Sequence, residues 1–568
     1  MKKLVNDPRR VVREMLEGVC DLDPGLALLA DHDVVVRADL PSPAGRTVAV
    51  ISGGGSGHEP AHAGYVGPGL LTAAVAGDVF TSPSVDAVLA CIRAAAGPAG
   101  AVLIVKNYTG DRLNFGLAAE MARALGILVE VVVVADDVAL SHTVPRERRR
   151  GIAGTVLVHK IAGAAAAAGH GVADVARLAR TAAADLGSMG VALGACTVPA
   201  VGRPGFVLGD DEIELGLGIH GEKGVERTAL ATADALVDRL LDAIVRDLGL
   251  AAGDPVALLV NGLGGTPQME LAVVARRALA ALRQRGIRVE RAWQGSLLTA
   301  LEMPGCSLSV MKLDGQRLSL IDAPVSAPAW PGSGLIGESR RLVAATVSEP
   351  EPSRTPGPHS RRLQSMAWAA AAALERAEPI LTELDTQAGD GDLGLGMTRG
   401  AEAIRALDLA AFADPVTALR SIGEAMRRAI GGSSGPFYAA ALLRAASELP
   451  AEPTAADWAK AFRAGTEAIG ELGGAKAGDC TMLDALLPAV EAFEANQSDA
   501  ARALAAAATS AEAGAAATAA LRPQLGRASY LGDRAIGIAD GGATAVAIWL
   551  RALATAFETD RRRDAQDP

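Results

Sequence analysis

A histidine, His220, stands inside the glycine-rich stretch GLGIHGEKG, residues 216–224. The first six residues fit the pattern G-x-G-x-x-G, but a dinucleotide-binding turn leads at once into a helix, whereas GEKGVER postpones the helix here to about Thr228. The acidic residue expected about 20 positions later would fall inside that same helix. A dinucleotide site is therefore disfavoured. His220 is either a structural histidine or a nucleophile whose nitrogen is held open toward a substrate carbonyl.

Two loops that follow predicted strands carry further reactive side chains. The loop SGGGSGHEPAHAG contains His58 and His62, and the loop VKNYTGDRLNFG contains Asp111. Glycines let backbone N–H groups approach a polar ligand, and ligands of open α/β sheets gather at the carboxyl ends of strands. Asp111 suits a helix N-cap and a general base equally well. The i, i+4 spacing of the two histidines would suit zinc on a helix face, but no third soft ligand lies nearby, which disfavours that site.

Three aspartates surround a glycine turn in LDTQAGDGDLGLG, residues 384–396. They are Asp385, Asp390 and Asp392. Carboxylate oxygens at this density suit a hard divalent cation that keeps positions free for phosphate oxygens and water. The alternative is a solvated turn. The flanking glycines indicate a tight backbone turn that brings the carboxylates together, which favours a site for magnesium with a nucleotide phosphate.

Two more turns have the composition of anion sites. GGSSGPFYA, residues 431–439, opens a helix with serine hydroxyls and N–H groups, and GRASYLGDRAIGIADGGA, residues 526–543, adds Arg527 and Arg534. Together with the aspartates, these turns predict a phosphate-binding site at one end of a helical domain. Mg²⁺ would there replace the lysine of a P-loop.

The elements that must position these residues fall into three regions. Short apolar runs alternate with amphipathic segments over residues 46–135, which predicts a parallel sheet with crossover helices, and a second α/β set ends near residue 325. A stretch rich in Pro, Ser and Gly follows, and after it the sequence consists of Ala- and Leu-rich helical segments. We predict a multidomain α/β plus all-α protein whose last part is an antiparallel bundle or barrel of about eight helices. The predicted boundaries are 1–325 for the α/β part, with subdomains at about 1–188 and 189–325, then 326–360 for the linker and 361–560 for the helical domain.

Composition narrows the class of protein. The 568 residues are 50% hydrophobic but only 3% aromatic, so the cores must be built from Ala, Val, Leu and Ile. The net charge is -11 and the basic residues are scattered, which argues against a nucleic-acid partner. The five cysteines are far apart and predict neither a disulfide framework nor a zinc site. No apolar run reaches the roughly 18 residues needed to span a bilayer, so we expect a cytoplasmic protein without a membrane partner.

Taken in order, the motifs resemble one family, the single-chain dihydroxyacetone kinases, which join a ketose-binding domain to an ATP-binding helical domain. The motifs similar to the first domain are SGGGSGHEPAHAGYVG, GDVFTSPS, VKNYTGDRLNFG, RRGIAGTVLVHKIAGA, GIHGEKG and VNGLGGT. Those similar to the second are LDTQAGDGDLG, GGSSGPFYA, GDCTMLDALLPA and GRASYLGDRAIG. The resemblance covers nearly the whole chain and implies ATP-dependent phosphorylation of dihydroxyacetone.

The resemblance also implies a role for each matched residue. His220 matches the histidine that bonds covalently, as a hemiaminal, to the ketone carbon. His58 and Asp111 match the pair that hydrogen-bonds the hydroxyl to be phosphorylated, with Asp111 as general base. The other implied positions are Gly55, Ser82 and Lys106 in the ketose pocket, Ser433, Ser434, Gly435, Thr481, Met482 and Arg527 around ATP, and Asp385, Asp390 and Asp392 on two Mg²⁺ ions.

Two positions depart from the family pattern. Cys480 stands where a lysine is common, and Gly541 replaces the proline of a frequent D-P-G. The alternatives that stay open are erythrulose or glyceraldehyde as the substrate, cyclisation of the FMN moiety of FAD by a FAD-AMP lyase activity, and a regulatory module that accepts a phosphoryl group from a carrier. The resemblance further implies a homodimer formed through the ketose-binding domain.

Overall fold

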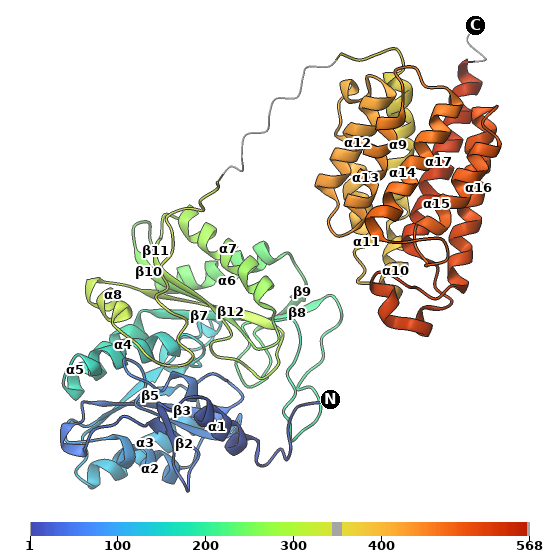
Figure 1. Cartoon of the computed structure of the whole chain (residues 1–568). Helices are drawn as coiled ribbons and strands as arrows, with labels where there is room; N and C mark the ends of the chain where they lie inside the picture. Colours follow the sequence, from blue (N-terminus) through green and yellow to red (C-terminus); the bar gives the residue numbers. More distant parts are fainter. Residues whose placement is uncertain (1, 344–354, 565–568) are drawn as a thin grey trace. The chain divides into compact units, whose positions relative to one another are not determined.

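Short, mainly apolar runs form the strands of the first six-stranded sheet (Figure 1). Its order is β1-β2-β4-β3-β5-β6, and β4, β3, β5 and β6 pair in parallel, while β1 and β2 pair antiparallel at one edge. The strand bounds are β1 Leu26–Leu28, β2 Val34–Arg37, β3 Ala49–Ser56, β4 Ala73–Val79, β5 Ala101–Lys106 and β6 Val129–Val134. β5 is buried along its whole length, as expected for a strand covered on both faces.

The second sheet has the order β11-β10-β12-β7-β8-β9, and in it only β10 and β11 are described as parallel neighbours. Its strands are β7 Leu186–Ala192, β8 Glu212–Leu215, β9 Glu226–Ala229, β10 Pro255–Gly262, β11 Arg288–Gly295 and β12 Gly305–Lys312. Strand β9 occupies residues in which the sequence predicted the start of a helix. That helix, α6 (Ala233–Leu248), begins later, where the Thr232 side chain accepts from the backbone N–H of Ala235.

Helices cover both sheets. The helices of this unit are α1 Val11–Leu22, α2 Val85–Ala95, α3 Thr109–Ala124, α4 Thr155–Ala167, α5 Val172–Ala184, α6, α7 Gln268–Gln284 and α8 Gly315–Asp322. Helix α4 is apolar on almost every side and is buried from Thr155 to Ala166. One hydrophobic core joins it to strands of both sheets, through Ile104 of β5 and Leu259 of β10 among others. The two predicted α/β subdomains therefore share a core.

The computed structural model describes residues 2–343 and 355–564, and the chain divides into two compact units, Met1–Val343 and Ala344–Pro568. Part of the predicted linker, residues 344–354, lies outside the described residues. Its first part is tied to the α/β unit, because the N–H groups of Ser326 and Ala329 donate to the carbonyls of Pro68 and Gly64.

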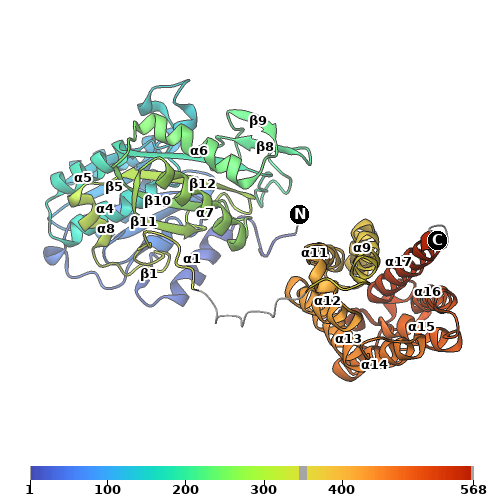
Figure 2. The same cartoon turned by 90° about the horizontal axis from the view of Figure 1, so that it is seen from above.

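The second unit is a closed ring of helices (Figure 2). Each helix of the series α9, α11, α12, α13, α14, α15, α16 and α17 contacts the next, and α17 contacts α9. The bounds are α9 Ser360–Arg376, α10 Glu378–Ala388, α11 Leu393–Arg405, α12 Pro415–Ala429, α13 Ser434–Glu448, α14 Ala455–Gly473, α15 Leu483–Ala495, α16 Ala500–Ala517 and α17 Gly541–Asp564. From α11 on, helices that follow one another in the chain are neighbours in the ring, which confirms the predicted helical barrel.

Helix α10 lies at one end of this ring and contacts α11, α17 and the 3₁₀ segment Arg527–Ala535. It begins one residue after Ala377, where Pro379 in its first turn cannot continue the hydrogen-bond ladder of α9. None of the helices in the described part of the chain combines the length and the apolar character that crossing a bilayer demands.

Candidate active site and metal-binding cluster

The loop between β8 and β9 presents His220. Position 218 has no room for a larger residue than glycine, because a Cβ on Gly218 would overlap the carboxylate of Glu222. That carboxylate folds back and accepts a hydrogen bond from the backbone N–H of His220 at 2.8 Å. Its other oxygen lies 3.6 Å from a guanidinium nitrogen of Arg150. The glycines therefore shape a turn that holds His220 in place. The residues after this turn, including Thr228, form a strand instead of a helix, so the G-x-G-x-x-G pattern is not a dinucleotide-binding turn here.

His220 faces His58, which follows the end of β3. The two Nε2 atoms are 3.1 Å apart, and Nδ1 of His58 lies 2.8 Å from the carbonyl oxygen of Thr299. A carbonyl only accepts, so Nδ1 of His58 carries the proton and its Nε2 carries the lone pair. In the neutral pair, His220 then donates from Nε2.

Burial keeps both imidazoles uncharged. Burial, the charge of Lys106 and that of Arg150 lower the pKa of His220 to about 3. The pKa of His58 is also far below its ordinary value, mainly because of burial and then because of Lys106 and His220. A neutral imidazole keeps the lone pair that a nucleophile or a base needs.

Aromatic rings enclose the pair. The ring of Phe80 stacks on His58 with centroids 5.3 Å apart, and the ring of Tyr108 meets His220 edge-on at 4.4 Å. Phe80 has a φ of 57°, a conformation that costs a non-glycine residue on the order of 1 kcal/mol or more. Such strain at a site wall indicates that the position of this ring is fixed by the surrounding fold.

Lys106 and Asp111 approach the same site from β5 and the first turn of α3. Burial raises the pKa of the Asp111 carboxyl, against the lowering effects of the Lys106 charge and of a hydrogen bond from Ser82. The Oδ1 atom of Asp111 is buried without a hydrogen-bond partner among the described residues. A buried acceptor of this kind is ready for a hydroxyl group of a ligand.

Gly55 lies at the end of β3, where the chain passes the Phe80–Ser82 turn too closely for a side chain. A Cβ on Gly55 would come within 2.5 Å of the backbone nitrogen of Thr81. Strand ends, loops and the first turn of α3 in one unit thus supply the six residues predicted for the ketose side, which are His58, His220, Asp111, Gly55, Ser82 and Lys106.

The expected helix after β3 is absent over residues 57–62, which form bends and turns before a short 3₁₀ segment at Ala63–Tyr65. His58 and His62 therefore do not share a helix face. His58 contacts His220, whereas His62 contacts Lys106 and Ser52.

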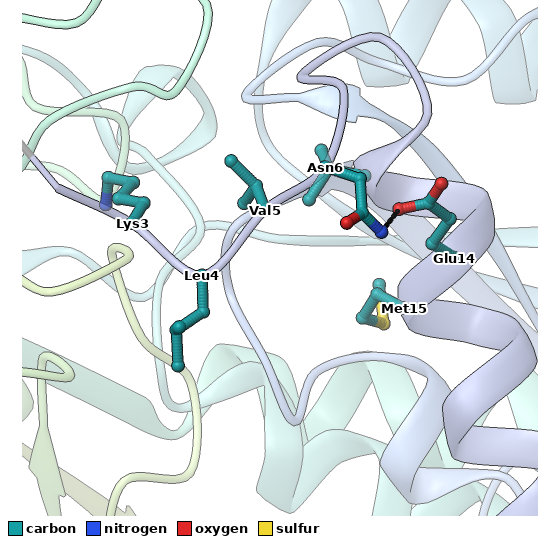
Figure 3. Close-up of a pocket in the computed structure, with 7 residues that line it drawn as sticks. Lys3, Leu4, Val5, Asn6, Glu14 and Met15 are labelled. Carbon is teal, nitrogen blue, oxygen red and sulfur yellow. Dashed lines mark hydrogen bonds between the residues drawn. The ribbon is translucent and has the colours of Figure 1, made fainter.

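A hollow of about 530 Å³ opens elsewhere on this unit, between the N-terminal segment and α1 (Figure 3). It is lined by Lys3, Leu4, Val5, Asn6, Val11, Glu14 and Met15. Asn6 donates to Glu14 there at 2.9 Å. None of the predicted site residues lines this hollow, so it is not the candidate active site.

In the helical unit, carboxylate oxygens of Asp385, Asp390 and Asp392 lie within 4.8 Å of one another. Asp385 is in the last turn of α10, and Asp392 is the N-cap residue of α11 but makes no side-chain cap bond. Asp385 accepts from the N–H of Leu393 at 3.1 Å, and Arg527 forms an ion pair with Asp390. Three convergent carboxylates of which two are exposed fit a hard divalent cation such as Mg²⁺.

The residues predicted to surround the nucleotide lie at the beginnings of helices and in loops of the same unit, and of these Arg527 contacts the cluster directly. Ser433 and Ser434 begin α13. A Cβ on Gly396 of α11 would lie 3.5 Å from Ile430, the residue that precedes the Ser433 turn. Gly435 also belongs to this turn.

Thr481 and Met482 precede α15, in a loop that Asp484 holds by accepting from the N–H of Thr481 at 2.8 Å. Cys480 adopts a φ of 61° in this loop and is buried, and Gly541 is the first residue of α17.

Asp540, which the sequence analysis did not single out, interacts with residues of three of these segments: the start of α17, the Thr481 loop and the end of α10. It caps α17 by accepting from the N–H of Ala543 at 2.7 Å. Burial, together with the charges of Asp484 and Asp385, raises its pKa to about 6. Asp540 is therefore a further carboxylate whose charge interacts with that of Asp385 in the cluster.

The fold and these two groups of side chains define a two-domain enzyme, with an α/β unit that holds the imidazole pair and a helical barrel that holds the carboxylates. Residues 17–329 match the Dak1 domain and residues 387–555 match the DAK2 domain. The chain belongs to the dihydroxyacetone kinase family.

Relatives match along the whole chain. A triokinase/FMN cyclase of Homo sapiens is 42% identical over 97% of this chain and 98% of its own. A D-erythrulose kinase of Mycolicibacterium smegmatis is 39% identical over 98% of both chains. The crystal structure of the dihydroxyacetone kinase from C. freundii, in complex with AMP-PNP and Mg²⁺, is 36% identical, with a TM-score of 0.62, and covers 98% of this chain and 99% of that chain.

Proposed function

We propose that this enzyme phosphorylates a primary hydroxyl of a small ketose, most simply dihydroxyacetone, with ATP, giving dihydroxyacetone phosphate and ADP. The observation that carries the proposal is the buried, neutral pair His220–His58 beside Lys106 and Asp111. A three-carbon ketose has too few atoms for tight non-covalent binding, so a reversible covalent bond to His220 supplies both affinity and orientation.

His58 assists the formation of that bond. Nε2 of His220 can attack the ketone carbon while its proton moves to Nε2 of His58, 3.1 Å away. The new C–N bond forms as the carbonyl π pair moves onto the oxygen. That oxygen then receives from His58 the proton that His220 released. The hemiaminal is neutral, both imidazoles are again neutral, and His58 stays oriented by Thr299.

Asp111 is the general base for the hydroxyl that is phosphorylated. Its unpartnered Oδ1 accepts the hydroxyl proton, and its raised pKa makes it a stronger base than an exposed aspartate. Lys106 offers positive charge to oxygen atoms of the same substrate, while Ser82 holds the carboxylate of Asp111 and Gly55 leaves room at the end of β3.

The helical unit holds the nucleotide in this proposal. Asp385, Asp390 and Asp392 would hold Mg²⁺, two ions as the family resemblance implies, and the bound metal would supply positive charge to the phosphates. Arg527 offers a guanidinium to phosphate oxygens. The turns that contribute N–H and hydroxyl groups contain Ser433, Ser434, Gly435, Thr481 and Met482.

We further propose the domain roles that the sequence suggested. Residues 1–325 bind the ketose, residues 326–360 link the domains, and residues 361–560 bind ATP. The same resemblance supports a homodimer formed through the ketose-binding domain.

Formation of the ketose adduct should be nearly independent of pH between about pH 5 and pH 8. A histidine with its ordinary pKa of 6.5 would become protonated and lose its nucleophilic lone pair in this range, but the pKa of His220 is lowered to about 3. Native mass spectrometry of the protein with dihydroxyacetone, over a pH series, measures the adduct. A decrease by half near pH 6.5 would contradict this assignment.

The substrate class is tested by ADP release in a coupled assay with dihydroxyacetone, glyceraldehyde, erythrulose and glycerol. We expect turnover with the carbonyl compounds and none with glycerol, because glycerol has no carbonyl for His220 to attack. Turnover of glycerol at a rate similar to that of dihydroxyacetone would refute the covalent anchor. The ranking of dihydroxyacetone against erythrulose and glyceraldehyde decides between the triose and tetrose alternatives.

A second candidate activity is the cyclisation of the FMN part of FAD, which splits off AMP. A 42% identical relative is a triokinase/FMN cyclase, and the carboxylate cluster could bind the metal and the diphosphate of FAD as it would bind those of ATP. Incubation with FAD and a divalent metal, followed by chromatography for cyclic FMN, tests this activity. His220→Ala should leave it intact if it resides in the helical unit alone.

A further inference from the structure

A chain of buried polar side chains to which the proposed reaction assigns no role lies next to Lys106. It consists of His62, Ser52 of β3 and His159 of α4, and all three side chains are buried. The Nζ atom of Lys106 lies 3.2 Å from Nε2 of His62. Oγ of Ser52 lies 3.4 Å from Nδ1 of His62 and 3.1 Å from Nε2 of His159.

The serine sets the direction of the protons in this chain. Its hydroxyl has one hydrogen, which it donates to the carbonyl oxygen of Ile104 at 2.7 Å. Toward both imidazoles the Ser52 oxygen can therefore only accept. His62 must carry its proton on Nδ1, and His159 must carry its proton on Nε2.

The consequence for Lys106 follows from the neutral state of His62. Burial, then the charge of Lys106 and the neighbouring imidazole of His159, keep the pKa of His62 far below its ordinary value. With its one proton on Nδ1, Nε2 of His62 presents a lone pair to Lys106, and the lysine is the donor. The sequence of donors runs from Lys106 to His62, then to Ser52 and to the carbonyl of Ile104.

A lysine ammonium has three donors and no preferred plane, so its direction depends on the acceptors around it. A Cβ on Gly54 would lie 3.0 Å from Nζ of Lys106 and 3.6 Å from Oδ2 of Asp111, so both groups flank this glycine. His62 accepts from the ammonium on the buried side. The remaining donors are thereby left for Asp111 and for a ligand.

We propose that His62, held as the Nδ1–H tautomer by Ser52, is the positioning residue that directs the Lys106 ammonium at the ketose. This role rests on the proposed function insofar as Lys106 contacts the ketose, whereas the tautomer itself does not. The competing explanation is that His62 only fills space in the core.

The first test reads the tautomer in the full-length protein without a ligand. Two-bond ¹H–¹⁵N correlation spectra of protein labelled with ¹⁵N-histidine, assigned with His62→Gln and His159→Gln, should show His62 protonated on Nδ1 and His159 protonated on Nε2. Protonation of His62 on Nε2, or on both nitrogens, would overturn the proposal. Because no ketose is present, this result does not depend on whether the enzyme binds one.

The second test separates positioning from packing by three substitutions. His62→Leu keeps the bulk and removes the acceptor, and it should raise the KM for dihydroxyacetone about 10- to 100-fold, the range that corresponds to the loss of a hydrogen bond to a charged group. His62→Gln keeps an amide oxygen that can accept from Lys106, so it should recover most of that loss. His159→Leu is the matched control, because His159 also contacts Ser52 but not Lys106, and it should change KM little.

An unchanged KM in a folded His62→Leu variant, or equal increases for His62→Leu and His159→Leu, would show that His62 only fills space. If His62→Leu does not fold, the tautomer measurement and the comparison of His62→Gln with wild type still decide. A wild-type protein with the expected tautomer but without any ketose turnover would refute the proposed function and leave the donor chain intact.

Discussion

His220→Ala should abolish the covalent ketose adduct and raise the substrate requirement by about 100-fold or more, since a small substrate that is no longer held in place loses its orientation as well as its affinity. The alanine removes the nitrogen that forms the bond. It leaves Asp111, Lys106 and the helical unit unchanged, so ATP binding should persist. Intact-protein mass spectrometry measures the adduct, and steady-state ADP release measures KM.

The control for this variant is His142→Ala, which removes an exposed histidine of the same unit that lies outside the site. It should keep both the adduct and the KM of the wild type. An unchanged KM in His220→Ala, or an adduct that survives in it, would contradict the covalent role of His220.

Asp390→Asn should reduce Mg²⁺-dependent turnover by about 100-fold or more and leave the ketose adduct intact. One of three carboxylates that can hold the cation becomes a neutral amide, and the metal supplies several kcal/mol of charge stabilisation in phosphoryl transfer. The variant also removes the ion-pair partner of Arg527. Turnover against Mg²⁺ concentration, with adduct formation followed separately, gives both readouts.

Asp533→Asn is the matched control, because this exposed aspartate lies in the same 3₁₀ segment as Arg527 but not in the cluster. It should behave as wild type. Loss of the ketose adduct in Asp390→Asn would show that the two groups of side chains are not independent. Full turnover would remove Asp390 from the metal site.

Long patterns in the sequence predicted the architecture well. The apolar runs at 46–135 are the four parallel strands β3 to β6, because strands covered on both faces must be apolar throughout. The Ala- and Leu-rich segments are the helices of the ring. Short elements were not predicted: β1 and β8 have three and four residues, too few for an alternating pattern to be distinguished from a loop.

The candidate site was predictable where one motif contains several of its residues. Tyr108, which encloses His220, lies inside the same motif as Asp111 and could have been included. Thr299 could not, because its role is a backbone carbonyl that the fold brings to His58 from 241 positions away. Local spacing was misleading for His62, since its i, i+4 relation to His58 has meaning only in a helix, and those residues form turns.

The central claim, a bond between His220 and the ketone carbon, is tested most directly by NMR. Protein labelled with ¹⁵N-histidine is mixed with dihydroxyacetone labelled with ¹³C at the ketone carbon. We expect the ketone signal to move to the range of tetrahedral carbon and to show a one-bond ¹³C–¹⁵N coupling, which is lost in His220→Ala. A bound carbonyl signal that does not move, or a tetrahedral signal without coupling to a histidine nitrogen, as addition to Lys106 would give, would contradict the account.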